Sequence, residues 1–272
     1  MRNSSLILII GLFISACGGG KYAATEKIYK AKAKEFSKGY LSQPAKDQLL
    51  DKVIYVDKEW VATTNFGVRK PNYVVLHHTA QDSIQQTIKT FHNQKVGASS
   101  HYVIGREGKI IQMVNDWYRG HHAGVGKWGN DTDLNSSSIG IELDNNGLTD
   151  PWPDVQINAL IQLLTYLKTT YKIPQGNFIG HMDLAPTRKI DPSRFPWKTL
   201  ADQGFGFWYD SLLEEPPADF TPTLALRIIG YDIKNLDAAI KAFKTHYIQT
   251  NNSTTWTPEE LKILYAIYKK YL

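Results

Sequence analysis

Cysteine is almost absent from this chain of 272 residues, which contains one. A single cysteine excludes disulfide bonds within the chain, so packing, with or without a metal, must stabilise the core. Basic runs are absent as well. The formal net charge of +5 favours an anionic partner, but without a basic run or a recognition motif no nucleic-acid partner is expected. Hydrophobic residues make up 42% of the chain, which suffices for one sizeable core and leaves room for a second, smaller domain.

The N-terminus has the pattern of an exported protein. Its apolar stretch, residues 6–14, is too short to cross a bilayer as a mature helix but suits the core of a secretory signal peptide. The stretch ends in Ile14-Ser15-Ala16-Cys17, which resembles the lipobox of bacterial lipoproteins, in which the cysteine becomes the acylated first residue. We predict a signal peptide over residues 1–16 and a membrane anchor on Cys17. The alternative is a buried apolar strand that contains the cysteine by accident.

The residues that follow Cys17 are interpreted as a tether. Gly18, not an aspartate, comes directly after the cysteine, and this predicts an outer-membrane lipoprotein that faces the periplasm. Three glycines and a polar stretch of weak periodicity lead to about Lys46. Residues 17–46 are therefore expected to link the anchor to the folded part of the chain.

Strand and helix patterns alternate along the middle of the chain. Short apolar runs bounded by turn residues predict strands over residues 73–77, 101–104, 109–114, 139–143 and 177–180. Apolar residues at helical spacing predict a helix over 84–91, capped by Asp82 or Ser83, and another over 155–171. Elements in this order predict an α/β domain over residues 47–210, with a central mixed β-sheet flanked by helices.

A change of composition marks the end of that domain. Glu214-Glu215-Pro216-Pro217 is typical of a linker, here assigned to residues 211–219. The rest, residues 220–272, contains three helical patterns and predicts a small all-α domain. Its last helix has a clear start, because Thr257 can cap it and Pro258 suits its first position.

Two histidines stand where predicted strands end. His77 is the last residue of one strand, and His181 directly follows another. Ten residues further on, Asp191 precedes a proline. Two imidazoles and a carboxylate from these positions would hold zinc with three ligands and leave a fourth position for water, as catalytic zinc sites do. Spacing alone does not separate such a site from structural roles, since most lone histidines are structural.

Five motifs resemble those of one family of enzymes, in content and in order. They are Val74-Val75-Leu76-His77-His78-Thr79-Ala80, Ser100-His101-Tyr102, Gly120-His121-His122-Ala123-Gly124, Ser138-Ile139-Gly140-Ile141-Glu142-Leu143, and residues 181–192 followed by Phe195-Pro196-Trp197. Together they resemble the type 2 N-acetylmuramoyl-L-alanine amidases, a group that includes phage lysozyme-type amidases and peptidoglycan recognition proteins. The resemblance covers about residues 51–207, and the lipobox with the C-terminal helices extends it to nearly the whole chain.

The resemblance implies the residues of the site. The metal ligands are then His77, His181 and Asp191, with Zn2+ as the cofactor. Glu142 corresponds to the family's catalytic glutamate, and Lys189 corresponds to its catalytic lysine. A glutamate can move a proton between water and the leaving amine, and a lysine can stabilise an oxyanion. Either residue could instead be a solvated surface charge.

The other histidines are weaker candidates. His101 and His122 are expected to support the metal ligands or to contact the substrate, and a plain packing role is the alternative. Asp183, which lies between two of the candidate ligands, is expected to orient the loop that joins them. The remaining histidines with an interpretation, as structural or surface residues, are His78, His92 and His246.

The resulting hypothesis is a monomeric zinc enzyme that cuts the amide between N-acetylmuramic acid and L-alanine in peptidoglycan or muropeptides, for remodelling or recycling of the cell wall. The alternatives are a non-catalytic peptidoglycan receptor on the same fold and a tethered scaffolding lipoprotein. A receptor is disfavoured because such proteins typically lose a metal ligand, and here all three are present. The C-terminal helices resemble a peptidoglycan-binding module, and a structural helical cap is the alternative for them.

Overall fold

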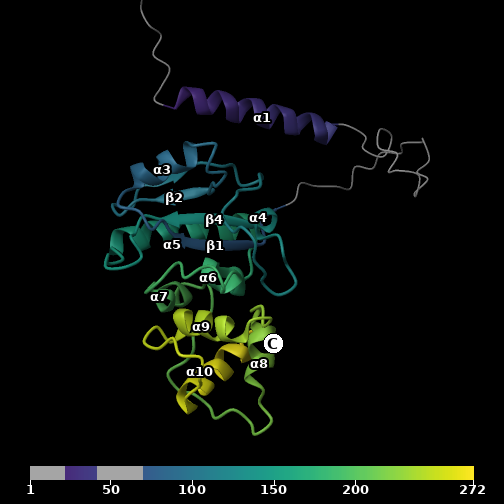
Figure 1. Cartoon of the computed structure of the whole chain (residues 1–272), viewed down its shortest axis with the longest axis vertical. Coiled ribbons are helices and arrows are strands. Elements are labelled where there is room, and N and C mark those ends of the chain that lie inside the picture. The colour runs from purple at the N-terminus through teal and green to yellow at the C-terminus, as the bar shows by residue number, and fades with distance from the viewer. Residues whose placement is uncertain (1–21, 42–69) are drawn as a thin grey trace, which may run out of the picture. The chain divides into compact units, whose positions relative to one another are not determined.

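The computed structural model describes residues 22–41 and 70–272 (Figure 1). The expected signal peptide, Cys17 and the residues from 42 to 69 lie outside these ranges. Within them, no helix combines the length and the apolar character needed to cross a membrane. Residues 22–41 and residues 70–272 belong to two separate compact units.

Helix α1 (Ala23–Leu41) occupies most of the segment expected to be a tether. Its sequence is rich in alanine, lysine and glutamate, which favour helix, while its apolar residues form only a weak amphipathic pattern. A weakly periodic segment can still be helical when its intrinsic propensity is high. Residues 23–41, which lie within the predicted tether, are therefore helical.

A five-stranded sheet forms the centre of residues 70–272 (Figure 1). Its strands are β1 (Tyr73–His78), β2 (Tyr102–Ile104), β3 (Ile110–Gln112), β4 (Ser138–Leu143) and β5 (Phe178–Gly180). They lie in the order β3-β2-β4-β1-β5, and only the β2–β3 pair is antiparallel. The mixed sheet and its predicted strands are confirmed, with small differences at the strand ends.

Helices follow and cover the sheet. In chain order they are α3 (Ile84–His92), α4 (Leu134–Ser137), α5 (Asp154–Tyr171), the 3-10 turn η1 (Gln175–Asn177), α6 (His181–Leu184), α7 (Trp197–Asp202), α8 (Pro222–Ile229), α9 (Leu236–Tyr247) and α10 (Pro258–Lys269). Ser83 caps α3, since its hydroxyl accepts from the backbone N–H of Gln86. Thr257 caps α10 through the backbone N–H of Glu260, as its sequence predicts.

One face of the sheet packs against α5. Alternate residues of β1 and β4 point into this core. Its members in these three elements include Val74, Leu76, Ile139, Ile141, Leu143, Leu160, Leu164 and Leu167. Because Ile141 and Leu143 lie in this core, Glu142 between them points to the opposite face of the sheet.

The opposite face carries a second core, and the C-terminal helices build most of it. Val75 of β1 and Ile179 of β5 pack there with residues of α6, α8, α9 and α10. The members from the C-terminal helices include Leu226, Ile229, Ala239, Phe243, Leu264 and Ile267. The small all-α part is present as predicted, and it shares a hydrophobic core with the sheet.

Strands β4, β1 and β5 are parallel neighbours, so their carboxyl ends meet at one edge of the sheet. His77 lies near the end of β1, Glu142 lies near the end of β4, and His181 directly follows β5. The topology thus brings together three residues that are far apart in the sequence.

Candidate active site

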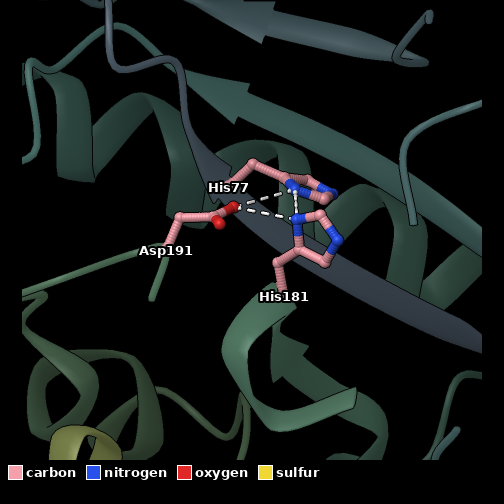
Figure 2. Close-up of side chains that lie close together, drawn as sticks. All are labelled: His77, His181 and Asp191. Atoms are coloured by element: carbon pink, nitrogen blue, oxygen red, sulfur yellow. Dashed lines mark hydrogen bonds and ion pairs between the residues drawn. The ribbon is translucent and has the colours of Figure 1, made fainter. Parts of the chain in front are cut away.

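Two histidine nitrogens and one carboxylate oxygen converge at this edge of the sheet (Figure 2). Nδ1 of His77 lies 2.9 Å from Nδ1 of His181 and 3.2 Å from Oδ2 of Asp191. Nδ1 of His181 lies 3.0 Å from the same oxygen. All three side chains are buried. The structure thus brings together the three residues that the sequence predicts as metal ligands.

A backbone carbonyl orients the ring of His181. Nε2 of this ring lies 2.9 Å from the carbonyl oxygen of Ala123, which can only accept a hydrogen bond. Nε2 therefore carries a proton, and Nδ1 is the nitrogen that can offer a lone pair to a metal. Arg188 donates from Nη2 to the same carbonyl oxygen at 3.0 Å, which holds this acceptor in place.

A chain of side chains orients the ring of His77. The hydroxyl of Ser138 donates to the carbonyl of Leu134, so its oxygen is free to accept from Nε2 of His122 at 3.4 Å. His122 then has an unprotonated Nδ1, which accepts from Nε2 of His77 at 3.1 Å. His77 is left with a lone pair on Nδ1, directed at the cluster.

The cluster has the charge and geometry of a metal site. Burial, together with the neighbouring His181, lowers the pKa of His77 to about 4, so this ring is neutral at pH 7. In the neutral form of both rings, the lone pairs of the two Nδ1 atoms face each other and the carboxylate of Asp191. A cation between them would remove this repulsion, and neutral imidazole is the form that binds metals.

The donor set fits zinc. Two imidazoles and one carboxylate are a ligand set of catalytic zinc sites, in which one position stays open. Tetrahedral zinc with bonds of about 2.0–2.1 Å places its ligand atoms about 3.3 Å apart. The triangle formed by His77, His181 and Asp191, with sides of 2.9, 3.0 and 3.2 Å, is close to that size.

A pocket of about 230 Å³ opens onto the cluster. The three candidate ligands line it, and so do Glu142 and Lys189. Its other lining residues are His78, Thr79, Ala80, Phe91, Ala98, Ser99, His121 and His122. The five residues that the sequence singles out for chemistry therefore border one cavity.

The register of the sheet holds Glu142 beside the cluster. In the parallel pair of β1 and β4 it lies opposite His77, so the two side chains leave the same face as neighbours. Burial, and next the charge of Asp191, raise the pKa of Glu142 to about 8. Its Oε2 is buried without a hydrogen-bond partner among the residues that the structure describes. A carboxyl group in this state is suited to accept and return a proton near neutral pH.

Lys189 comes from the turn that follows α6. Its backbone N–H donates to the carbonyl of Ala185 at 3.0 Å, which folds the turn back on the helix. The N–H of Met182 donates to the carbonyl of Asp191 at 2.9 Å. One short segment therefore carries two of the candidate ligands, His181 and Asp191, together with Lys189.

The two weaker candidates have different surroundings. His122 lines the pocket and contacts the ring of His77. His101 is fully buried and is not among the residues that line the pocket. Its Nδ1 accepts from the N–H of Gly140 at 3.0 Å, and its Nε2 donates to the carbonyl of Tyr118 at 2.9 Å. These contacts fit the packing role that the sequence leaves open for His101.

Two histidines that line the pocket carry no functional prediction from the sequence. The sequence is interpreted as giving His78 a structural or surface role, yet His78 lines the pocket, as does His121. Each is the neighbour of a predicted site residue in a His-His pair, and this pairing is the signal that could have identified them. Arg188, beside Lys189, gives no such signal, because its contact with the Ala123 carbonyl joins segments that are far apart in the sequence.

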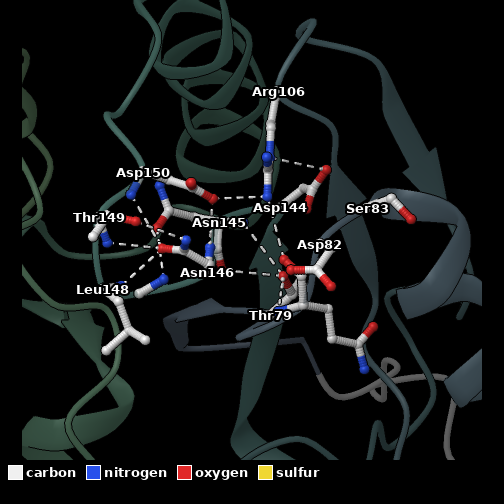
Figure 3. A network of polar contacts seen from close by, with 12 residues as sticks. Thr79, Asp82, Ser83, Arg106, Asp144, Asn145, Asn146, Leu148, Thr149 and Asp150 are labelled. Atoms are coloured by element: carbon white, nitrogen blue, oxygen red, sulfur yellow. Dashed lines mark hydrogen bonds and ion pairs between the residues drawn. The ribbon is translucent and has the colours of Figure 1, made fainter.

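A polar network fixes the loop after β4 (Figure 3). The side-chain oxygen of Asn146 accepts from three following backbone N–H groups, at 2.8, 3.0 and 3.1 Å. Nη2 of Arg106 lies 2.8 Å from Oδ2 of Asp150. The carbonyl of Asn145 accepts at 3.0 Å from the N–H of Ala80, which lines the pocket. The loop that follows Glu142 thereby positions part of the pocket wall.

Known proteins are similar to this chain in both sequence and fold. The sequence profile of the N-acetylmuramoyl-L-alanine amidase family (Amidase_2) matches residues 67–194. The chain is 33% identical to the N-acetylmuramoyl-L-alanine amidase AmiD of Escherichia coli (strain K12) over 230 residues, which cover 73% of this chain and 82% of AmiD.

Two solved structures extend the comparison. The complex of AmiD from E. coli with the substrate anhydro-N-acetylmuramic acid-L-Ala-D-gamma-Glu-L-Lys has a TM-score of 0.66 and 29% identity, covering 81% of this chain and 96% of that one. AMPDH3 from Pseudomonas aeruginosa has a TM-score of 0.67 and 30% identity, covering 80% of this chain and 99% of that one. With the profile match and the identity to AmiD, these likenesses show that the chain belongs to the N-acetylmuramoyl-L-alanine amidase family.

Proposed function

We propose that the chain is a zinc-dependent enzyme that hydrolyses the amide bond between N-acetylmuramic acid and L-alanine in peptidoglycan or its fragments. The observation that carries the proposal is the convergence of His77, His181 and Asp191 in one pocket with Glu142 and Lys189. The substrate class is supported by the AmiD complex, whose substrate is an anhydro-N-acetylmuramic acid peptide.

Glu142 has the properties of the group that moves the proton. When bound, zinc lowers the pKa of water towards about 7 and polarises the amide carbonyl. The ionised form of Glu142 takes a proton from the attacking water, because this residue lines the same pocket as the cluster and its Oε2 has no hydrogen-bond partner among the described residues. As the carbon–nitrogen bond breaks, Glu142 returns this proton to the leaving nitrogen of L-alanine. The water is thereby divided between the new carboxyl group and the new amine.

Among the described residues that line the pocket, Lys189 is the one lysine or arginine. When water adds to the carbonyl carbon, negative charge develops on that oxygen, and an ammonium group on the same cavity stabilises it. The rings of His77 and His181 cannot take this part, because their second nitrogens are engaged with His122 and with a backbone carbonyl. Loss of one such donor typically costs about 100-fold to 1000-fold in kcat.

Release of stem peptide tests the proposal. Purified sacculi and defined muropeptides would be incubated with wild type, His181→Ala and Glu142→Gln, and the zinc content of each protein would be measured. Wild type is expected to contain zinc and to release peptide. Glu142→Gln should retain its zinc and lose activity, whereas His181→Ala should lose both. Equal release by wild type and His181→Ala would overturn the assignment of the site.

We also propose that the chain is an outer-membrane lipoprotein, anchored through Cys17 and acting as a monomer in the periplasm. Support comes from the lipobox-like sequence that ends at Cys17 and from the apolar stretch of residues 6–14. Labelling with palmitate is expected for wild type and not for Cys17→Ser, and the label should fractionate with the outer membrane. A labelled Cys17→Ser protein would contradict the anchor. Light scattering of the solubilised protein tests the monomer.

A further inference from the structure

One buried carboxylate joins the start of α6 to the C-terminal helices. Oδ2 of Asp183 accepts from the backbone N–H of Gly180 at 2.7 Å and from Nδ1 of His246 at 2.9 Å. Its Oδ1 accepts from the hydroxyl of Tyr231 at 2.8 Å. His246 lies in α9 and Tyr231 follows α8, so two of the three donors come from residues 220–272.

Asp183 belongs to the segment that carries two of the candidate metal ligands, His181 and Asp191. His181 is the first residue of α6, and Asp183 lies two residues later in the same short helix. The N–H of Met182, between them, donates to the carbonyl of Asp191 at 2.9 Å. A movement of α6 would therefore displace His181 and Asp191 together.

The two donors from the C-terminal helices are themselves held firmly. The buried ring of His246 stacks on Trp197 and on Tyr247, with 3.9 and 4.1 Å between ring centroids. Tyr231 is also buried and packs edge-on against Trp128, with centroids 5.0 Å apart. Neither His246 nor Tyr231 is among the residues that line the pocket. Their hydrogen bonds to Asp183 are what connect them to the candidate metal site.

The burial of Asp183 makes these contacts necessary. The residue is 0% exposed, and an ionised carboxylate is costly to remove from water unless hydrogen bonds replace its hydration. Without His246 and Tyr231, Gly180 would be its one remaining donor among the three. A carboxylate left in this state would favour a shift of α6 towards water, and the candidate ligands would shift with it.

We propose that His246 and Tyr231 are positioning residues for the metal centre, and that the C-terminal helices complete this centre from outside the pocket. The inference rests on the proposed zinc site and goes beyond it, because it gives residues 220–272 a part in holding the ligands. His246 and Tyr231 act through Asp183, which fixes the start of α6 and so the directions of His181 and Asp191.

Zinc affinity separates positioning from a merely structural role. The full chain would be titrated with zinc against a chromophoric chelator as wild type, His246→Leu, His246→Asn and Tyr231→Phe. Asparagine is the conservative replacement, because its side-chain NH2 can donate from the position of Nδ1. Tyr265→Phe is the matched control, since it also removes a hydroxyl from a C-terminal helix, α10, and its ring packs on Phe220 and not on the residues around Asp183.

We expect His246→Leu and Tyr231→Phe to weaken zinc binding about tenfold or more, in the range known for outer-shell partners of metal ligands. His246→Asn should recover most of the affinity, and Tyr265→Phe should leave it unchanged. Unfolding midpoints of the same samples show which variants are folded during the titration.

Tyr231→Phe, the mildest change, decides the result if His246→Leu does not fold. Wild-type zinc affinity in the folded variants, even with a lowered unfolding midpoint, would overturn the proposal. A wild type that binds no zinc would instead overturn the proposed zinc site itself.

Discussion

Nε2 of His77 lies 3.1 Å from Nδ1 of His122, and this contact sets which nitrogen of His77 faces the candidate metal site. His122 is oriented in turn by the hydroxyl of Ser138. A residue that offers no atom to the cluster thus controls the tautomer of one candidate ligand. The orientation of His77 is a supporting role of the kind that the sequence leaves open for His122.

Replacing His122 by alanine is expected to lower zinc affinity about 10-fold to 100-fold, because Nε2 of His77 loses its acceptor and the ring is free to exchange tautomers. His121→Ala is the matched control. His121 is the adjacent histidine and lines the same pocket, but its Nδ1 bonds to the carbonyl of Gly97 at 3.2 Å. Zinc titration of both variants checks the prediction, and equal affinities would contradict it.

Gly140 leaves the space that the ring of His122 occupies. A Cβ at this position would lie 2.3 Å from Cγ of His122, whose ring is buried and cannot turn aside. Gly140→Ala is expected to destabilise the protein by about 1–3 kcal/mol and to weaken zinc binding.

Gly105→Ala is the control for Gly140→Ala. There the new Cβ would meet the flexible carboxyl end of Glu107, which can move away. Denaturant unfolding of the two variants measures the difference. If Gly140→Ala were as stable as Gly105→Ala, the close approach of the His122 ring would be refuted.

The placement of some site residues at strand ends and on one face of a strand was predictable from local sequence patterns. His77 ends an apolar strand, and the two apolar neighbours of Glu142 fix the face to which it points. The register that sets Glu142 opposite His77 could not be predicted in this way, because it depends on which strands pair. The family resemblance, not the spacing, is what links these positions before the fold is known.

Local sequence patterns did not predict the contacts between segments that are distant in the sequence. His246 and Asp183 are 63 residues apart, and the helical pattern around His246 does not mark it as a buried donor. An amphipathic helix likewise reveals an apolar face but not the surface that the face covers. The packing of the C-terminal helices on Val75 and Ile179 therefore appears only in the fold.

Glu142 should make the stability of the metal-free protein depend on pH. The pKa of this carboxyl is raised from an ordinary 4.5 to about 8, first by burial. In this interval the folded state holds a proton that the unfolded state has released. The stabilisation from neutral Glu142 is therefore full below about pH 4.5 and is lost as the pH rises through about 8.

Glu142→Gln removes this dependence, because its side chain is neutral at every pH. Relative to wild type, the unfolding midpoint of the chelator-treated variant is expected to increase between about pH 5 and about pH 9. Thermal unfolding in matched buffers measures the difference. A difference that stayed constant over this range would contradict the raised pKa of Glu142.

The shared core predicts that the C-terminal helices and the sheet unfold together. Leu226 of α8 is fully buried in the core that contains Val75, whereas Leu224 in the same helix is 50% exposed. Leu226→Ala is expected to cost about 2–5 kcal/mol, and Leu224→Ala much less. In Leu226→Ala the helical signal and the tryptophan fluorescence should change in one transition at one temperature. Two separate transitions would contradict a shared core.

Deletion of residues 220–272 extends the same argument to activity. The loss of α8, α9 and α10 would expose Val75 and Ile179 on one face of the sheet, and it would remove two donors from buried Asp183. We therefore expect the shortened chain to lose turnover of small muropeptides as well as of sacculi, which an independent wall-binding module would not cause. The assay compares both substrates for the full and shortened chains at equal concentration. A shortened chain that stays folded and cleaves small muropeptides at the wild-type rate would contradict this dependence of the site on the C-terminal helices.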